Sequence, residues 1–266
     1  MLAAFDEAGT PRALRGGQRT VWHVNDTVFK PLDAPVAAID WQGRILDGLV
    51  AEVRTAPPRT ARDGRWVVDG WTAWRYERGT HRPAAWPAVA SAGRALHRAL
   101  ANLAAPEWLA ARDDPWARAE RIAWSDEVPR AVEDTPLLAA LADRRRPLDP
   151  VTHRSQLVHT DLAGNVLFAP HTTPLVLDLS LSWRPTPYAS AIVAADAMLW
   201  EGAGPEVVDR VASAETDDAQ EVFGQFLLRA VIFRLLAARL GRFHVDATTL
   251  HGEFAGVAAE AIRRCS

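Results

Sequence analysis

The chain has 266 residues, of which 48% are hydrophobic and 24% charged, and this composition fits one large globular domain or two lobes that share a cleft. Its net charge of -3 offers no basic surface for a phosphate backbone, so we expect no nucleic-acid partner. The single cysteine, Cys265, excludes an internal disulfide and a cysteine-based metal cluster, and it suits a cytoplasmic protein.

The first part of the chain, residues 1–79, has mostly strand-like periodicity and starts without the apolar core of a secretory signal. Two short apolar runs within residues 19–32 are split by an Asn-Asp pair, which is a hairpin signature. Apolar residues then recur at helical spacing and predict a helix over residues 36–49. Residues 64–79 predict two more strands, joined through an Asp-Gly pair.

The second part, residues 80–266, is predicted to be mainly helical. Helical periodicity is clear over residues 86–103, whereas residues 105–136 are rich in Pro, Asp and Trp and predict short helices and loops. The most apolar late stretch, residues 223–241, carries three arginines at near-helical spacing. We therefore expect an amphipathic helix there and no membrane span.

Polar residues interrupt two apolar runs in the middle of this second part. His159, Asp161 and Asn165 precede one predicted strand, and Asp178 ends the next. A hairpin would bring Asn165 and Asp178 to the same end, where two oxygen ligands suit Mg²⁺. Asp161 would face that site and accept a proton from an attacking hydroxyl. The simpler alternative is that these are ordinary turn residues.

The segments "HTDLAGNVLF" and "LVLDLS" resemble the catalytic loop and metal-binding aspartate of the aminoglycoside phosphotransferase and choline kinase branch of the protein-kinase-like superfamily. Asp161 and Asn165 are four positions apart, as in that branch, one fewer than in protein kinases. The resemblance covers nearly the whole chain and extends to an actinobacterial family within the branch. It implies an α+β, bilobal protein-kinase-like fold, with a small β-rich nucleotide-binding lobe (1–79) and a larger helical lobe (80–266) that holds the catalytic loop and acceptor site.

The resemblance also implies roles for the central residues. Asp161 becomes the catalytic base or the group that orients the acceptor hydroxyl, and Asn165 and Asp178 become the Mg²⁺ ligands. His159 supports the loop by packing and hydrogen bonding. Thr160 departs from the pattern, because the family usually has glycine there.

Lys30, which is the only lysine in the chain, is the candidate for holding the ATP phosphates at a strand end. An exposed edge-strand lysine is the alternative, but an arginine fork does not replace a compact ammonium aimed at phosphates. Such a lysine normally pairs with a carboxylate on the small-lobe helix. We predict Asp40 as that partner, with Asp47 as a second candidate, although the usual residue is glutamate.

Two further segments are expected to contact the nucleotide. Gly16 and Gly17 would let the backbone approach the phosphates closely, although a double glycine before a strand is also typical of a plain turn. Backbone groups around Trp74, Arg75 and Tyr76 would hydrogen-bond the adenine edge, unless these aromatic residues only pack within the strand.

The acceptor side is expected in the helical lobe. Asp196 lies on an apolar helical segment, where burial without a partner would be costly. The resemblance implies that it braces the catalytic loop through backbone amides, and a solvent-facing acid is the alternative. Trp183 and Arg184 could line the acceptor site. Acids within residues 124–134 and 215–221, together with tryptophans, would suit a hydroxylated, cationic or partly apolar acceptor. The alternative is that the acids are solvated and the tryptophans belong to the core. The tryptophans are Trp124, Trp183 and Trp200.

The sequence therefore predicts an ATP- and Mg²⁺-dependent transfer of phosphoryl to a hydroxyl of a small molecule, with GTP as the alternative donor. A second hypothesis is a catalytically impaired, nucleotide-binding scaffold or regulator, which Asp40 and Thr160 support. A third is a metal hydrolase that uses His159, Asp161 and Asp178. That reading lacks the further histidine or carboxylate ligands such sites need.

Overall fold

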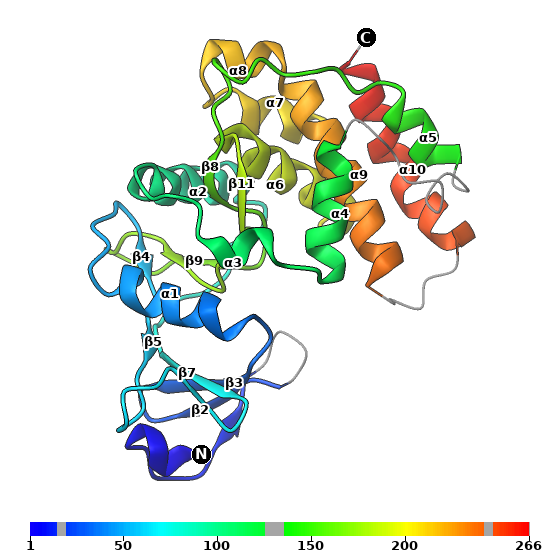
Figure 1. Cartoon of the computed structure of the whole chain (residues 1–266). Helices are drawn as coiled ribbons and strands as arrows, with labels where there is room; N and C mark the ends of the chain where they lie inside the picture. The colour runs from blue at the N-terminus through cyan, green and yellow to red at the C-terminus, as the bar shows by residue number, and fades with distance from the viewer. Residues whose placement is uncertain (15–19, 126–135, 242–246, 266) are drawn as a thin grey trace.

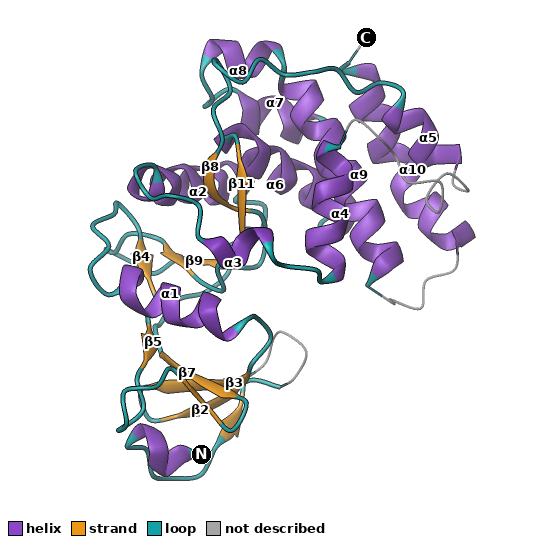
Figure 2. Cartoon of the chain, viewed as in Figure 1, coloured by secondary structure: helices purple, strands orange, loops and turns teal. Residues whose placement is uncertain are grey.

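The computed structural model describes residues 1–14, 20–125, 136–241 and 247–265. One lobe, which includes the N-terminus, is built on a sheet, and the other is formed mainly by helices (Figures 1 and 2). The expected α+β, bilobal fold is therefore confirmed. None of the helices in the described residues combines the length and the apolar character that crossing a bilayer requires.

The smaller lobe contains an antiparallel sheet with the strand order β1-β2-β3-β7-β5, and β6 also pairs with β7. Both predicted hairpins are present, since β2 pairs with β3 and β6 pairs with β7. Asn25, Asp69 and Gly70 have φ angles of 51°, 51° and 74°, the left-handed backbone that tight hairpin turns need. The strands are β1 (Arg12–Ala13), β2 (Trp22–Val24), β3 (Thr27–Pro31), β5 (Pro58–Arg59), β6 (Val67–Val68) and β7 (Trp71–Arg75).

The predicted helix of the smaller lobe forms as α1 (Val36–Leu46). Its buried face points into the molecule, whereas Asp40 is half-buried and Asp47 is exposed. Residues of one helix face recur every three or four positions, so a buried face fixes which neighbours lie outside it. The buried residues are Ala38, Ile39, Gln42, Gly43 and Leu46.

The larger lobe is a helical assembly around one apolar core. A short η1 (Leu2–Phe5) belongs to the smaller lobe. The helices of the larger lobe are α2 (Trp86–Leu100), α3 (Glu107–Ala110), α4 (Pro115–Trp124), α5 (Pro136–Ala142), α6 (Thr186–Trp200), α7 (Glu206–Ala212), α8 (Asp217–Glu221), α9 (Phe223–Leu240) and α10 (Ala247–Arg263).

Helix α9 differs from the predicted amphipathic helix, because residues 223–237 are buried on every side. It packs against α4, α6 and α10. Arg229 and Arg234 are buried with 7% and 6% exposure, and both donate hydrogen bonds to internal acceptors. A buried cation is tolerated only where such partners compensate for lost hydration, so the arginines mark internal contacts and not a solvated face.

Two short strand pairs position the predicted catalytic residues. β8 (Gln156–His159) pairs with β11 (Leu181–Arg184), and β9 (Val166–Leu167) pairs with β10 (Leu175–Val176). The second pair is the predicted hairpin, and the amide of Leu177 bonds to the Asn165 carbonyl at 2.9 Å. β10 also pairs in parallel with β4 (Arg54–Thr55), which ties this hairpin to the segment that follows α1.

Candidate active site

A cavity of about 600 Å³ lies between the strands of the smaller lobe and the catalytic loop. Five of the predicted site residues line it: Lys30, Trp74, Asp161, Asn165 and Asp178. Residues of α1, of α9 and of the segment from α3 to α4 complete the wall. The fold thus brings residues that are up to 148 positions apart in the sequence, Lys30 and Asp178, into one cavity.

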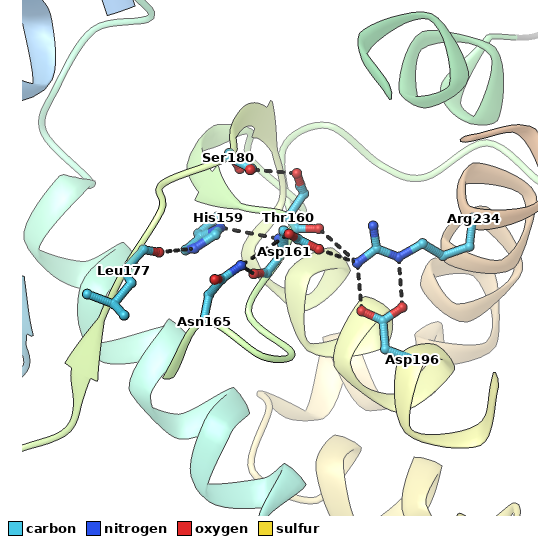
Figure 3. Close-up of polar contacts among 8 residues, drawn as sticks. All are labelled: His159, Thr160, Asp161, Asn165, Leu177, Ser180, Asp196 and Arg234. Carbon is cyan, nitrogen blue, oxygen red and sulfur yellow. Dashed lines mark hydrogen bonds and ion pairs between the residues drawn. The ribbon is translucent and has the colours of Figure 1, made fainter. Parts of the chain in front are cut away.

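His159 anchors the start of the catalytic loop from inside the core (Figure 3). Its Nδ1 accepts the backbone N–H of Asp161 at 3.2 Å, and its Nε2 lies 3.0 Å from the carbonyl oxygen of Leu177. The ring can meet both contacts only as the neutral tautomer that carries its proton on Nε2. Burial lowers the pKa of His159, which favours that neutral form.

A second buried histidine supports the first. The backbone N–H of His159 donates to Nε2 of His97 on α2, at 2.9 Å. Burial lowers the pKa of His97 to about 3, and the neighbouring His159 and Arg94 act in the same direction. Both rings are therefore neutral at physiological pH, and they fix the loop through hydrogen bonds without adding charge.

Asp161 is held from two sides while its carboxylate stays accessible (Figure 3). Oδ1 accepts from Nη2 of Arg234 at 2.9 Å, and Oδ2 accepts from Nδ2 of Asn165 at 3.1 Å. The same Asn165 nitrogen donates to the Asp161 carbonyl at 2.7 Å. The side chain is nevertheless 44% exposed, so this carboxylate is oriented and still within reach of a ligand in the cavity.

Asp196 braces the loop through Arg234 and not through the predicted backbone amides. Its carboxylate accepts from Nε and Nη2 of Arg234 at 2.7 and 2.6 Å, and Nη2 also lies 3.4 Å from the Thr160 carbonyl. Burial raises the pKa of Asp196 to about 6, and the bidentate contact with Arg234 opposes that shift. Burial alone would lower the pKa of Arg234, but Asp196 and Asp161 beside it raise that pKa.

Lys30 lies opposite the catalytic loop and is paired across the cavity. Its Nζ is 2.6 Å from Oδ1 of Asp178 and 3.7 Å from Oδ2 of Asp33, and it lies 5.0 Å from the centre of the Trp74 ring. Asp178 has a positive φ of 47°, a conformation that residues other than glycine adopt rarely and that clusters at functional sites.

The predicted pairing of Lys30 with Asp40 does not occur in the described residues, where the ion pairs of Lys30 are with Asp178 and Asp33. The cause is the register of α1, because the face turned toward the cavity carries Ala38, Ile39 and Gln42. Gln42 is 5% exposed, and its Oε1 has no hydrogen-bond partner within the described residues. Gln42, and not Asp40, is therefore the polar residue of α1 that lines the cavity with Lys30.

Asn165 and Asp178 offer a donor set that fits a hard divalent cation. Both side-chain hydrogen bonds of Asn165 are donated by Nδ2, so its side-chain oxygen Oδ1 is left to bind a metal. Asp178 adds a carboxylate. Mg²⁺ prefers few protein oxygens and keeps water and phosphate as its other ligands. No group of three or more His, Cys, Asp or Glu side chains gathers in the described residues, so the metal-hydrolase reading gains no support.

The predicted nucleotide contacts divide into two groups. Trp74 lines the main cavity with Lys30, but Arg75 and Tyr76 line a second, smaller cavity of about 350 Å³. The backbone N–H groups of Arg75 and Tyr76, which were predicted to bind the adenine edge, already donate hydrogen bonds within the protein. Their acceptors are the carbonyls of Pro57 and Asp26, at 3.2 and 2.8 Å. The predicted phosphate loop, Gly16 and Gly17, lies outside the described residues.

On the acceptor side, the structure replaces most of the predicted residues. Trp183 and Arg184 do not line the cavity within the described chain; instead Arg184 pairs with Glu120, and Trp183 packs on the core. Trp124 also packs in the core, against Tyr188 and Phe226. Leu181 and Ser182, at the start of β11, line the cavity in their place.

Several residues of the site, in the cavity wall or behind it, were not predicted from the sequence. Arg234 and His97 act through contacts made by distant helices, and their only local signal is a polar residue inside an apolar helical run. Trp108 and Trp116 lie in the segment with weak periodicity, where no pattern indicates which ring faces inward.

Solved structures of small-molecule kinases have a similar fold. Amicoumacin kinase hAmiN, in complex with AMP-PNP, Ca²⁺ and Ami, is 12% identical, with a TM-score of 0.64 over 95% of this chain and 88% of that chain. Aminoglycoside phosphotransferase APH(4)-Ia, as a thermostable mutant, is 14% identical, with a TM-score of 0.60 over 97% of each chain. Choline kinase LicA from Streptococcus pneumoniae is 11% identical, with a TM-score of 0.57 over 94% and 93%.

These identities are low, so the likeness establishes the fold and not the activity. No protein-family model matches the chain, and neither does any curated protein sequence. The narrower resemblance to an actinobacterial family stays a prediction. The chain has the protein-kinase-like fold found in the aminoglycoside phosphotransferases and choline kinases, as the sequence predicted.

Proposed function

We propose that this protein transfers the γ-phosphoryl group of ATP, with Mg²⁺, to a hydroxyl of a small molecule. The observation that carries the proposal is the cavity in which Lys30, Asp161, Asn165 and Asp178 converge. We assign nucleotide binding to residues 1–79 and the acceptor site to the helical lobe. GTP is the alternative donor.

Nucleotide binding requires Lys30 to change partners. Its ammonium is now 2.6 Å from Asp178, the carboxylate proposed to bind Mg²⁺. A cation on Asp178 and Asn165 would neutralise that charge, and Lys30 would then pair with phosphate oxygens. The unpartnered Oε1 of Gln42, in the same cavity, can accept a hydrogen bond from the released ammonium. This exchange takes the place of the lysine–glutamate pair expected on the small-lobe helix.

The chemistry is a phosphoryl transfer in which the acceptor oxygen forms a bond to the γ-phosphorus and the bond to the ADP oxygen breaks. Asp161 orients the acceptor hydroxyl and takes its proton, because its carboxylate is exposed to the cavity and held by Arg234 and Asn165. Bound Mg²⁺ neutralises charge on the phosphates. Lys30, once released from Asp178, would add a second positive charge beside the phosphates.

The hypothesis of an impaired scaffold loses one of its two supports. The Thr160 hydroxyl donates to the carbonyl of Ser180 at 3.1 Å, and the residue is 6% exposed. Its side chain is therefore accommodated within the loop and does not displace Asp161. The absence of a glutamate on α1 remains as the other support, and the Gln42 contact proposed above addresses it.

The test is a transfer assay with product-mass detection. Purified protein, ATP and Mg²⁺ are incubated with a panel of hydroxylated metabolites and antibiotics, and the expected product is heavier by one phosphoryl group. Asp161→Asn keeps the metal ligands and should lower turnover by about 10³-fold. Normal turnover in Asp161→Asn would remove Asp161 from the mechanism, and an unreactive panel together with no Mg²⁺-dependent nucleotide binding would contradict the proposed function.

A further inference from the structure

One end of the cavity is built from the segment between α3 and α4. Trp108 and Trp116 line it, together with Ala117 on α4 and Ile39 on α1. Trp116 is 39% exposed, and Trp108 is half-buried, with its ring 6.2 Å from that of Trp41 on α1. This end of the cavity therefore presents flat aromatic and aliphatic surface.

The charged residues of the same wall are engaged with each other. Nε and Nη2 of Arg112 donate to the Asp114 carboxylate at 2.8 and 3.0 Å, and Nη1 donates to the carbonyl of Leu181 at 3.3 Å. Asp114 also accepts the N–H of Ala117 at 3.0 Å, which caps the start of α4. The pair is thus fixed at both ends.

Glu120 shows the same pattern one turn further along α4. Its carboxylate accepts from Nε and Nη2 of Arg184 at 2.5 and 3.0 Å, and its side chain is only 10% exposed. The Arg184 guanidinium also lies 5.0 Å from the centre of the Trp124 ring. In the described part of this wall, Arg112 forms one balanced pair with Asp114 and Arg184 forms another with Glu120, whereas Arg234 is shared between Asp161 and the buried Asp196.

This pairing decides between the acceptor chemistries that the sequence left open. A cationic acceptor gives up more hydration than an uncharged one when it enters a cavity. Because Asp114 and Glu120 already hold guanidinium partners, cation–π contact with the tryptophans is what this part of the wall offers against that loss. An uncharged ring loses little hydration and gains contact with the indole faces. Resting on the proposed function, we propose that the acceptor is an uncharged, ring-bearing alcohol, whose ring lies on Trp108 and Trp116 and whose hydroxyl reaches Asp161.

The first test separates binding from transfer. Protein saturated with AMP-PNP and Mg²⁺ is titrated with two uncharged probes, phenyl β-glucoside and uridine, and with two cationic probes, choline and kanamycin. We expect the uncharged probes to bind at least about tenfold more tightly. Equal or tighter binding of the cationic probes, or no binding of the uncharged probes at millimolar concentration, overturns the inference.

The second test makes a cationic site on purpose. Arg112→Gln leaves Asp114 without its guanidinium partner, so affinity for choline should rise by about tenfold. Arg118→Gln is the matched control, because it removes an arginine of α4 from an exposed pair with Asp113, and neither residue lines the cavity. A thermal melt of each variant checks folding. An unchanged choline affinity in folded Arg112→Gln counts against the charge argument.

A third variant tests the aromatic contact. Trp116→Ala should weaken phenyl β-glucoside binding by about tenfold and leave the affinity for AMP-PNP unchanged. Trp22→Ala, at a similarly exposed tryptophan of the smaller lobe, should change neither. If AMP-PNP binds with Mg²⁺ but the uncharged probes do not, only the acceptor class is wrong. If AMP-PNP does not bind, the proposed function fails and the acceptor class fails with it.

Discussion

The catalytic loop and the nucleotide-facing strands both present short polar motifs, but the molecule holds them in different ways. Asp161 rests on buried groups, since His159 lies beneath it and the Arg234–Asp196 pair lies beside it. Lys30 is instead held by the half-exposed Asp178 and the exposed Asp33. The loop is therefore fixed before any ligand arrives, whereas the lysine is free to exchange partners when a ligand binds.

The largest expected effect concerns the buried side of this comparison. Arg234→Gln leaves Asp196 buried without a cation, so the free energy of unfolding should fall by about 3 kcal/mol. Urea denaturation measures the change. Arg239→Gln, on the exposed end of the same helix, is the control and should cost less than about 0.5 kcal/mol. Equal losses in the two variants would show that the buried pair does not anchor the loop.

Acid should loosen the same anchor. The pKa of His97 is lowered to about 3, so the folded protein holds this ring neutral, while the unfolded chain takes up a proton as the pH falls below about 6.5. Stability is then lost as the pH falls, by about 2 kcal/mol between pH 7 and pH 5 for this ring.

His97→Gln removes the titrating group and keeps an acceptor for the His159 amide, so its stability should depend less on pH than that of the parent. Urea unfolding at the two pH values gives the comparison. The same loss in both proteins would mean that His97 is protonated in the fold.

Lys30 lies on the side of the site that is proposed to exchange partners, and its positive charge alone should not be enough for nucleotide binding. Lys30→Arg keeps the cation but replaces a compact ammonium with a planar fork, so affinity for Mg²⁺-loaded AMP-PNP should fall by about tenfold. Calorimetric titration measures it. Identical affinity in the variant would make Lys30 a surface residue without a role in binding.

The smallest expected effect distinguishes Gln42 from Asp40. Gln42→Leu removes the buried acceptor proposed for Lys30 and should raise the ATP KM by about fivefold with little change in kcat. Gln42→Glu should keep the ATP KM near that of the parent, because it restores an acceptor oxygen. Asp40→Asn is the matched control on the same helix and should have no effect. A larger increase in the ATP KM for Asp40→Asn than for Gln42→Leu would show that Asp40 is the partner of Lys30, as the sequence predicted.

Sequence reasoning succeeded where the polar residues are close together along the chain. The spacing of Asp161 and Asn165, and a hairpin that ends at Asp178, were sufficient to place three cavity residues. It failed where a contact depends on the rotation of a helix. Asp40 and Gln42 are two positions apart, and only the packing of α1 decides which one faces Lys30.

The same limit explains the acceptor side. Arg234 and Asp196 come from different helices, and the pairing of Arg112 with Asp114 depends on a turn between two short helices. The acids that suggested a hydroxylated, cationic or partly apolar acceptor are not acids of that wall: residues 126–134 lie outside the described residues, and residues 215–221 do not line the cavity in the described chain. Which acid pairs with which arginine is decided by tertiary structure and cannot be predicted from composition.

The measurement that tests the account most directly is a titration of AMP-PNP with and without Mg²⁺, in the parent protein, Asp178→Asn and Asp33→Asn. Both acids contact Lys30, but only Asp178 is proposed to hold the metal. We predict that Mg²⁺ increases the affinity of the parent and of Asp33→Asn by at least about tenfold and leaves that of Asp178→Asn unchanged. The same Mg²⁺-dependent gain in Asp178→Asn would contradict a nucleotide site built on the exchange between Lys30 and the metal.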